Sequence, residues 1–310
     1  MKRNFRIIIF LASVIAVVIL FSCNKKSDTI PQETILTGKT TILVDETIKP
    51  IIEDQIQVFE SQYNAEIAMV AKSEKECLND FLAQKEKIVI LSRKLTDNES
   101  SVFKAKKITP KTTVFAKDAI VLIVNKEEKD SLIDFQEIIN FVKEGRVSTR
   151  FKGLVFDNPN SSTVRFICEN ANIEKLPETG IFSFASNEEV IQYVAQNKGM
   201  IGIIGVNNIF QPKANLQEAV TKVKMLKVKY NTNDYIAPSQ ESIAQGIYPL
   251  ARLLYIVNCQ GYVGLGMGFS SFVAGEIGQR IILTSGLSPV NMPTHDIRIR
   301  KEIIKDKNKN

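Results

Sequence analysis

The stretch Phe156-Asp157-Asn158-Pro159-Asn160-Ser161-Ser162-Thr163-Val164-Arg165-Phe166 decides how the rest of the chain is interpreted. The apolar run that leads into it is typical of a buried strand, an Asx-Pro turn follows, and apolar residues at helical spacing begin at Val164. A strand that turns into a helix through Ser-Ser-Thr offers backbone N–H groups and hydroxyl donors at the positive end of a helix dipole. The stretch therefore predicts an anion site. Ser161 as a simple helix N-cap explains the same residues without a ligand.

The composition describes a globular protein with room for two domains. The chain has 310 residues, of which 44% are hydrophobic and 24% are charged. Half of the net charge of +6 lies before the first apolar run, and the other half lies in the charged tail at 294–310. The body is therefore close to neutral, which speaks against a nucleic-acid partner.

The histidine and cysteine usage limits the possible chemistry. The single histidine, His295, lies in the charged tail, so neither a Ser-His-Asp machine nor a histidine metal site is expected. The cysteines are too scattered to form a metal site in its place. We expect no enzyme, no cofactor and no metal. A phosphatase that uses Asp157 or Ser161 as a nucleophile is kept as an alternative.

The N-terminus has the layout of a secretory signal. A basic start is followed by an uncharged apolar run over 7–21, which is shorter than the roughly 20 residues of a membrane-spanning helix. Leu20-Phe21-Ser22-Cys23 resembles the lipobox of bacterial lipoproteins. The resemblance implies a lipoprotein signal peptide at 1–22, lipidation of Cys23 and a flexible tether at 23–38. An uncleaved membrane anchor is the alternative, and either way the body lies outside the inner membrane, on its periplasmic side.

Strands and helices alternate through the body, which predicts an α/β fold with parallel sheets. We expect two strands at 112–115 and 118–124, one half-exposed strand at 223–229, and one helix that carries the apolar residues from 269 to 282. The three cysteines that remain after Cys23 lie in apolar segments, and we expect them to be buried free thiols. In parallel sheets ligands bind at the carboxyl ends of the strands. Polar side chains follow three predicted strands at such ends, namely Asp45-Glu46-Thr47, Ser73 and Ser92-Arg93.

From about Thr40 to Val290 the chain resembles the substrate-binding proteins of bacterial phosphate ABC transporters. The markers are Val44-Asp45-Glu46-Thr47, Ser92-Arg93-Lys94-Leu95-Thr96, Asp118-Ala119-Ile120, Ser161 to Phe166, Ile201 to Gly205 and Tyr248-Pro249-Leu250-Ala251-Arg252. The resemblance implies a two-lobed, type II periplasmic binding protein. Each lobe would be a mainly parallel sheet flanked by helices, and two crossover strands would join the lobes. We place lobe 1 at 39–117 and 223–293, and lobe 2 at 118–222.

The resemblance also implies a set of ligand-binding residues: Glu46, Thr47, Ser73, Arg93, Asp157, Ser161, Ser162, Thr163 and Arg165. Ser162 stands where the family has glycine. Arg93 and Asp157 stand where many relatives have an aspartate and an arginine, so the two charges appear exchanged. Arg93 would grip a phosphate and Asp157 would accept the proton that phosphate keeps and sulfate lacks. A structural Arg93–Asp157 bridge is the alternative. Arg165 could lie on a solvated face, and we give Arg252 a structural role.

These observations predict an extracytoplasmic lipoprotein that captures inorganic phosphate between two lobes and delivers it to an ABC transporter permease. We expect a monomer that is held at the membrane through its lipid anchor. One alternative is a binder of another oxyanion, such as molybdate, or of a small phosphorylated compound. Another is a sensor, an adhesin or a phosphatase-like protein on the same fold.

Overall fold

The computed structural model describes residues 33–145, 148 and 150–293. The described residues from Thr34 to Pro293 belong to one compact unit. The predicted signal peptide 1–22, the lipidation site Cys23, the tether up to residue 32 and the charged tail 294–310 lie outside the described residues. Within the described ranges, no helix has the length and apolar character needed to cross a membrane.

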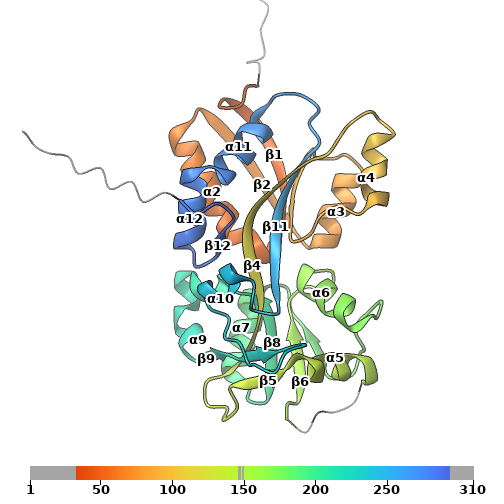
Figure 1. Cartoon of the computed structure of the whole chain (residues 1–310), viewed down its shortest axis with the longest axis vertical. Coiled ribbons are helices and arrows are strands. Elements are labelled where there is room, and N and C mark those ends of the chain that lie inside the picture. The colour runs from red at the N-terminus through yellow and green to blue at the C-terminus, as the bar shows by residue number, and fades with distance from the viewer. Residues whose placement is uncertain (1–32, 146–147, 149, 294–310) are drawn as a thin grey trace, which may run out of the picture. The chain divides into compact units, whose positions relative to one another are not determined.

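Most strands belong to one long mixed sheet (Figure 1) with the order β2-β1-β3-β11-β4-β8-β6-β7. These strands are β1 (Gly38–Asp45), β2 (Ala65–Lys72), β3 (Ile88–Leu91), β4 (Lys111–Asn125), β6 (Gly153–Phe156), β7 (Ile181–Ser183), β8 (Met200–Gly205) and β11 (Ala251–Asn258). Two further strands, β9 (Val223–Met225) and β12 (Ser288–Pro289), pair with β4. The strands β5 (Leu132–Asp134) and β10 (Lys227–Lys229) form a separate parallel pair.

Helices cover this sheet in two groups, one on each side of the crossing β4 and β11 (Figure 1). The first group is η1 (Glu46–Ile48), α2 (Lys49–Gln62), α3 (Glu74–Leu82), α4 (Asp97–Lys104), α11 (Leu265–Ala274) and α12 (Glu276–Thr284). The second group is α5 (Phe135–Glu144), α6 (Ser162–Ala171), α7 (Asn187–Gln196), α8 (Asn207–Phe210), η2 (Ala214–Leu216) and α9 (Gln217–Thr221). The short α10 (Gln240–Gln245) lies between the groups. The expected two-lobed α/β architecture is confirmed.

The strand β4 runs from one lobe into the other without interruption. Its residues 111–119 pair with β11, and its residues 120–123 pair with β8. We expected two strands here with a break near Lys117, and that expectation was wrong. The Lys117 ammonium leaves the sheet to donate to the carbonyl of Ala244 at 2.6 Å, while its backbone keeps its place in the ladder. A polar residue in an apolar run therefore marks an outward side chain and not the end of the strand.

The segment 223–229 was also predicted wrongly, as one strand. It is divided at Leu226 into β9, which pairs with β4, and β10, which pairs with β5. Both pairings lie with the second group of helices. The lobe boundaries at 118 and 223 stay a prediction. These pairings favour a boundary after Lys229, where the chain would pass from lobe 2 back to lobe 1.

The predicted single helix over residues 269–282 is two helices, α11 and α12, separated at Gly275. The backbone of Gly275 is extended, with φ −83° and ψ 177°. The second helix then folds back so closely that a Cβ on Gly278 would meet Val273 backbone atoms at 2.5 Å. A helical apolar period continues across the break, and for this reason the sequence pattern did not reveal it.

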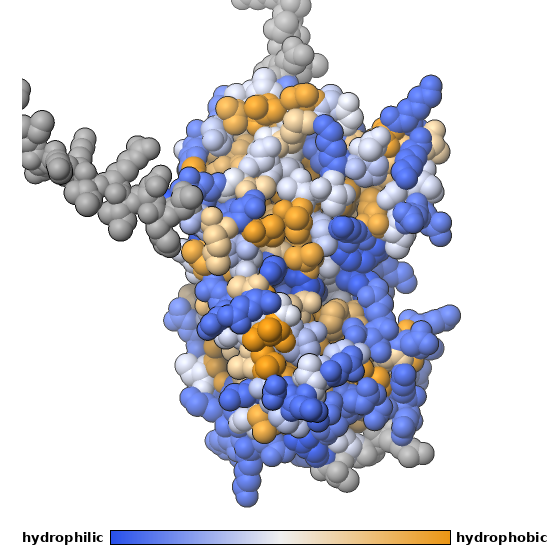
Figure 2. All heavy atoms as spheres, in the orientation of Figure 1, coloured by the Kyte–Doolittle hydropathy of each residue, from blue (hydrophilic) through white to orange (hydrophobic). Residues whose placement is uncertain are grey.

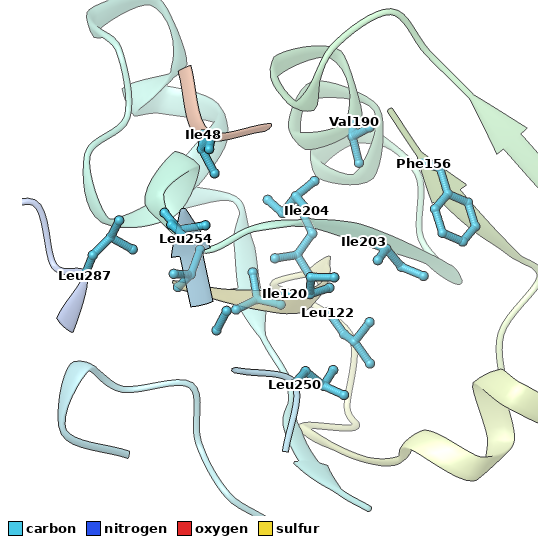
Figure 3. Close-up of a cluster of buried hydrophobic side chains, with 14 of the residues drawn as sticks. Ile48, Ile120, Leu122, Phe156, Val190, Ile203, Ile204, Leu250, Leu254 and Leu287 are labelled. Atoms are coloured by element: carbon cyan, nitrogen blue, oxygen red, sulfur yellow. The ribbon is translucent and has the colours of Figure 1, made fainter. Parts of the chain in front are cut away.

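The hydrophobic core is continuous across the β4 crossing. Figure 3 shows part of it, with Ile120 and Leu122 of β4 packed near Ile203 and Ile204 of β8 and Leu250 before β11. All of these side chains are fully buried. Figure 2 shows hydrophilic residues over most of the lower half of this face, with hydrophobic residues at the top and in patches down the middle of the view. As expected, Cys77, Cys168 and Cys259 are free and buried.

Candidate functional site

The loop between β6 and α6 has the geometry that its sequence predicts. Ser161 caps α6, and its Oγ accepts the N–H of Val164 at 3.3 Å. Among the described residues, nothing accepts the backbone N–H groups of Ser162 and Thr163 in the first turn of this helix. The side chains of Ser161, Ser162 and Thr163 are all at most 1% exposed. The loop thus holds unused N–H donors and hydroxyls in a buried place, which is what an oxyanion requires.

Asp157 organises these hydroxyls. Its Oδ1 accepts hydrogen bonds from Ser161 Oγ and Thr163 Oγ1, each at 2.6 Å. Its Oδ2 accepts one from the Asn187 amide at 3.1 Å. The side chain is fully buried, and burial raises the pKa of its carboxyl, although the two hydroxyl donors oppose this effect. Asp157 therefore faces hydroxyls of its own loop and α7, not Arg93.

A hydroxyl pair joins the two lobes. Thr47 Oγ1, which follows β1, lies 2.9 Å from Ser162 Oγ at the start of α6. A backbone bond from Lys75 N to Asn160 O, at 3.2 Å, connects the same two segments next to the pair. Two of the predicted binding residues are thus brought together, although they are separated by 115 positions in the chain. We call Thr47, Ser161, Ser162 and Thr163 the hydroxyl cluster.

The cation of the hydroxyl cluster is Arg252, to which sequence reasoning gave only a structural role. Its NH1 donates to Ser162 Oγ at 2.9 Å, and its NH2 donates to Thr47 Oγ1 at 3.3 Å. Its Nε and NH2 both lie 2.8 Å from Asp118 Oδ2. Arg252 interrupts an apolar run of β11, and Asp118, next to Lys117, interrupts an apolar run of β4. These two charged interruptions were the signal that could have revealed the pair.

The other predicted cations and Ser73 lie beside the hydroxyl cluster and are occupied by carboxylates. Arg93 forms a two-pronged pair with Glu99, with both distances at 2.8 Å, and lies 3.5 Å from Glu74. Arg165 reaches across to the same Glu74, so it does not lie on a solvated face. Ser73 caps α3, and its Oγ donates to Glu76 at 2.5 Å. No described contact links Arg93 to Asp157.

Carboxylates outnumber cations at the centre of the site. Burial, with help from Glu74, raises the pKa of Asp45 to about 6, while Arg252 opposes the rise. Burial and the nearby Asp157 and Asp45 raise the pKa of Glu46 to about 7. No three His, Cys, Asp or Glu side chains in the described ranges are grouped so that they could hold a metal ion.

Two cavities open next to the hydroxyl cluster. The larger, of about 770 Å³, lies between α3 and α6 and is lined by Arg93, Arg165 and Ser161, together with apolar side chains. The smaller, of about 200 Å³, is lined by Glu46 from one lobe and Asn187 from the other. Glu46, which we predicted to contact the ligand, therefore lines the smaller cavity and not the larger one.

Comparisons with known proteins agree with this architecture. Residues 30–276 match a family model described as PBP superfamily domain. A solved Clostridium perfringens protein, assigned as a phosphate ABC transporter substrate-binding protein and holding bound phosphate, is 18% identical with a TM-score of 0.67. That match covers 82% of this chain and 100% of the other.

Two more solved structures resemble the chain. An ABC-type phosphate transport receptor from Vibrio cholerae is 15% identical with a TM-score of 0.63, over 81% of this chain and 100% of that one. PstS from Borrelia burgdorferi is 20% identical with a TM-score of 0.53, over 82% and 99%. At such identities these likenesses establish the fold. A search of the curated proteins found no match.

Proposed function

The chain belongs to the PBP superfamily domain family, and we propose that it is an extracytoplasmic solute-binding protein that captures inorganic phosphate between its lobes. The observation that carries the proposal is the buried hydroxyl cluster bonded to Arg252, next to the unused N–H groups of Ser162 and Thr163. Hydroxyls, backbone N–H groups and a guanidinium are the donors that a tetrahedral oxyanion accepts. The solved likenesses from Clostridium perfringens and Vibrio cholerae, which their descriptions connect with phosphate, support the same choice.

We assign to Arg252 the role of phosphate-binding cation that the sequence analysis gave to Arg93. Arg252 is 8% exposed, and its guanidinium already touches a residue of each lobe, so an anion that replaces the hydrogen bond between Thr47 and Ser162 would meet it directly. Arg93 is held by Glu99 and would have to leave that pair to reach a ligand. We therefore assign phosphate to the hydroxyl cluster and Arg252, and we assign to Arg93 the support of the neighbouring wall.

Asp157 supports a preference for phosphate over sulfate. Burial raises the pKa of its carboxyl, and a raised pKa strengthens the carboxylate as a proton acceptor. Phosphate near neutral pH keeps a proton to donate, whereas sulfate offers only acceptors to this carboxylate.

Calorimetry on a protein of residues 34–310 tests the assignment. We expect phosphate to release heat on binding and sulfate to bind far more weakly. Ser162→Ala removes one hydroxyl, and its phosphate affinity is expected to fall about tenfold, the usual value of one hydrogen bond to a charged ligand. Arg252→Lys keeps a positive charge beside Asp118 but loses the two guanidinium donors that reach Ser162 and Thr47, so its phosphate affinity is also expected to fall.

Two controls separate site effects from general ones. Ser101→Ala, on the exposed side of α4, should bind phosphate as the parent does. Arg93→Ala should weaken binding less than Arg252→Lys if Arg252 is the phosphate cation. Absence of phosphate heat in the parent, or equal affinity for sulfate, would overturn the proposal. If Ser162→Ala binds phosphate as tightly as Ser101→Ala does, the hydroxyl cluster is not part of the phosphate site.

The envelope location and the delivery step rest on the N-terminal sequence and the family. We infer that Cys23 is lipidated, that the lipid holds a monomeric protein at the membrane on the periplasmic side, and that an ABC transporter permease receives the phosphate. Labelling of cells with a fatty-acid analogue tests the anchor. The parent should carry label and stay with membranes, and Cys23→Ser should lose both properties. An unlabelled parent would contradict the lipoprotein assignment.

A further inference from the structure

Two exposed apolar segments lie close together at one end of lobe 1. The segment that leads into β1 carries Ile35 and Leu36, and the loop between β11 and α11 carries Tyr262 and Val263. Each of these side chains is at least 40% exposed, and Val263 reaches 66%. The backbone of Ile35 crosses the first turn of α11 so closely that a Cβ on Gly268 would stand 1.7 Å from its carbonyl oxygen.

Strand register places both segments at the edge of the sheet that lies away from the phosphate site. The parallel strands β1, β2 and β3 begin on this side, and the antiparallel β11 ends here, with Asn258 opposite Ile88 and Lys111. Thr47 of the hydroxyl cluster follows the other end of β1, an eight-residue strand of about 25 Å. In Figure 1 the chain enters β1 at the top of the view, where Figure 2 shows hydrophobic residues. A partner at this edge would therefore leave the phosphate site open.

Lysines predominate among the charged residues around these apolar side chains. Among the connecting segments 34–37, 63–64, 83–87, 105–110 and 259–264, the one carboxylate is Glu86. Lys85 is paired with Asp80 at 2.6 Å, and Lys39 is paired with Glu66. The other exposed lysines of this edge are Lys87, Lys106, Lys107 and Lys111. The edge thus carries an excess of positive charge.

The covalent chain limits how far this edge can lie from a membrane. Thr34, the first residue of the compact unit, follows Cys23 by eleven positions, and we infer that Cys23 is lipidated. An extended chain advances at most about 3.6 Å per residue, so a lipid on Cys23 would hold Thr34 within about 40 Å of the bilayer surface. A weak contact then suffices, because the tether keeps the edge at a high local concentration.

We propose that this edge of lobe 1 is a membrane-contact surface for anionic phospholipid. The side chains of Ile35, Tyr262 and Val263 would enter the headgroup region, and the surrounding lysines would contact lipid phosphates. The inference goes beyond the phosphate proposal, and its test uses neither phosphate nor the lipid on Cys23.

The chemistry of the edge fits a bilayer surface. Apolar side chains surrounded by lysines bind an anionic bilayer by burial of apolar area together with attraction to the lipid charge. Tyr262 suits the boundary because its ring is apolar and its hydroxyl is polar, and Lys87 Nζ lies 5.5 Å from the centroid of that ring. A second copy of the chain fits less well, because a symmetric dimer through this edge would bring like charges together.

Vesicle binding tests the inference on a protein of residues 34–310, which lacks both the apolar run 7–21 and Cys23. Sedimentation measures the partition of this protein onto vesicles of equal parts phosphatidylglycerol and phosphatidylcholine, with pure phosphatidylcholine as the neutral comparison. We expect binding to the anionic vesicles to be at least about tenfold tighter and to weaken as salt is added. No binding to the anionic vesicles would overturn the inference.

The apolar contribution is tested by Val263→Ser. This variant should bind the anionic vesicles at least about threefold more weakly, because it removes the most exposed apolar side chain of the edge. Leu132→Ser, at an exposed position in lobe 2, is the matched control and should bind as the parent does. Val263→Ser should keep the phosphate affinity of the parent, so failure of the membrane contact and failure of the phosphate site are distinguishable.

The charge contribution is tested by replacing Lys106 and Lys107 together with glutamine. We expect vesicle binding to fall at least about fivefold. The matched control replaces Lys126 and Lys129, two exposed lysines of lobe 2, and should have no effect. The charged tail is present in every variant, so it does not contribute to the differences between them. Equal binding by the edge variants and their controls would place the contact elsewhere and refute the inference.

Single tryptophans locate the contact without weakening it, since the chain has no tryptophan of its own. In Val263→Trp the emission should shift to shorter wavelength on anionic vesicles and be quenched by brominated lipid, whereas Phe182→Trp in β7 should show neither effect. Equal responses from the two reporters, or no response from Val263→Trp, would contradict the proposal. Self-association of the parent that Val263→Ser abolishes, without vesicle binding, would identify a second copy as the occupant and refute the lipid assignment.

Discussion

Asp45 should make the protein less stable as the pH rises, and Asp45→Asn should remove that dependence. The Asp45 side chain is fully buried, and its Oδ1 accepts the N–H of Thr47 at 3.1 Å. In the part of the chain that the structure describes, its Oδ2 has no hydrogen-bond partner. Burial raises its pKa from 3.8 to about 6. A difference of about two pKa units corresponds to about 3 kcal/mol between the protonated and the ionised carboxyl.

The sign follows from where the proton is held more tightly. The folded chain keeps the Asp45 proton up to about pH 6, whereas the unfolded chain releases it near 3.8. The stabilising effect is therefore present at low pH and is lost between pH 4 and pH 6. Asparagine resembles the protonated form and does not titrate. The stability of Asp45→Asn relative to the parent should thus increase by about 2 kcal/mol between pH 4 and pH 8.

Urea unfolding of both proteins at pH 4, 6 and 8, followed by circular dichroism, measures this change. Any fixed cost of the new amide, which has two N–H groups to satisfy, cancels because only the pH dependence is compared. Asp234→Asn, at an exposed position, controls for the loss of one negative charge, and its difference from the parent should stay flat. A constant difference between Asp45→Asn and the parent from pH 4 to pH 8 would refute the reasoning.

Three further outcomes follow from local geometry. Gly202→Ala should lower the free energy of unfolding by about 1–3 kcal/mol, because its Cβ would stand 2.9 Å from three aliphatic side chains; an unchanged urea midpoint would show that the core can yield. Native Cys77 and Cys259, whose pKa burial raises to about 12, should resist a disulfide reagent at pH 8 and react only after unfolding, so fast labelling of the native chain would contradict their burial. The hydrogen bond from Arg93 lowers the pKa of Glu99, so the stability that this pair contributes should be present near neutral pH and be lost as the pH falls through the acid range. The urea midpoint of Glu99→Gln should therefore decrease less than that of the parent as the pH is lowered.

Local patterns were sufficient wherever a single segment carried its own signal. The helix start at Ser161 and the burial of Cys77, Cys168 and Cys259 as free thiols were predicted from the sequence and are present. The breaks at Leu226 and Gly275 and the continuity through Lys117 were missed. In each of these cases the deciding factor is a partner from elsewhere in the chain or a close approach between helices, and neither changes the local apolar period.

The sequence by itself determined that Ser161-Ser162-Thr163 would open a helix after a buried strand, because capping and apolar spacing are properties of neighbouring residues. Only the tertiary structure decided which charges meet there. Arg252 comes from a strand 90 residues away in the chain and reaches Ser162, while Arg93 is held by Glu99, only six residues further on. The pairing of charges depends on distances across the sheet, and a linear sequence does not contain them.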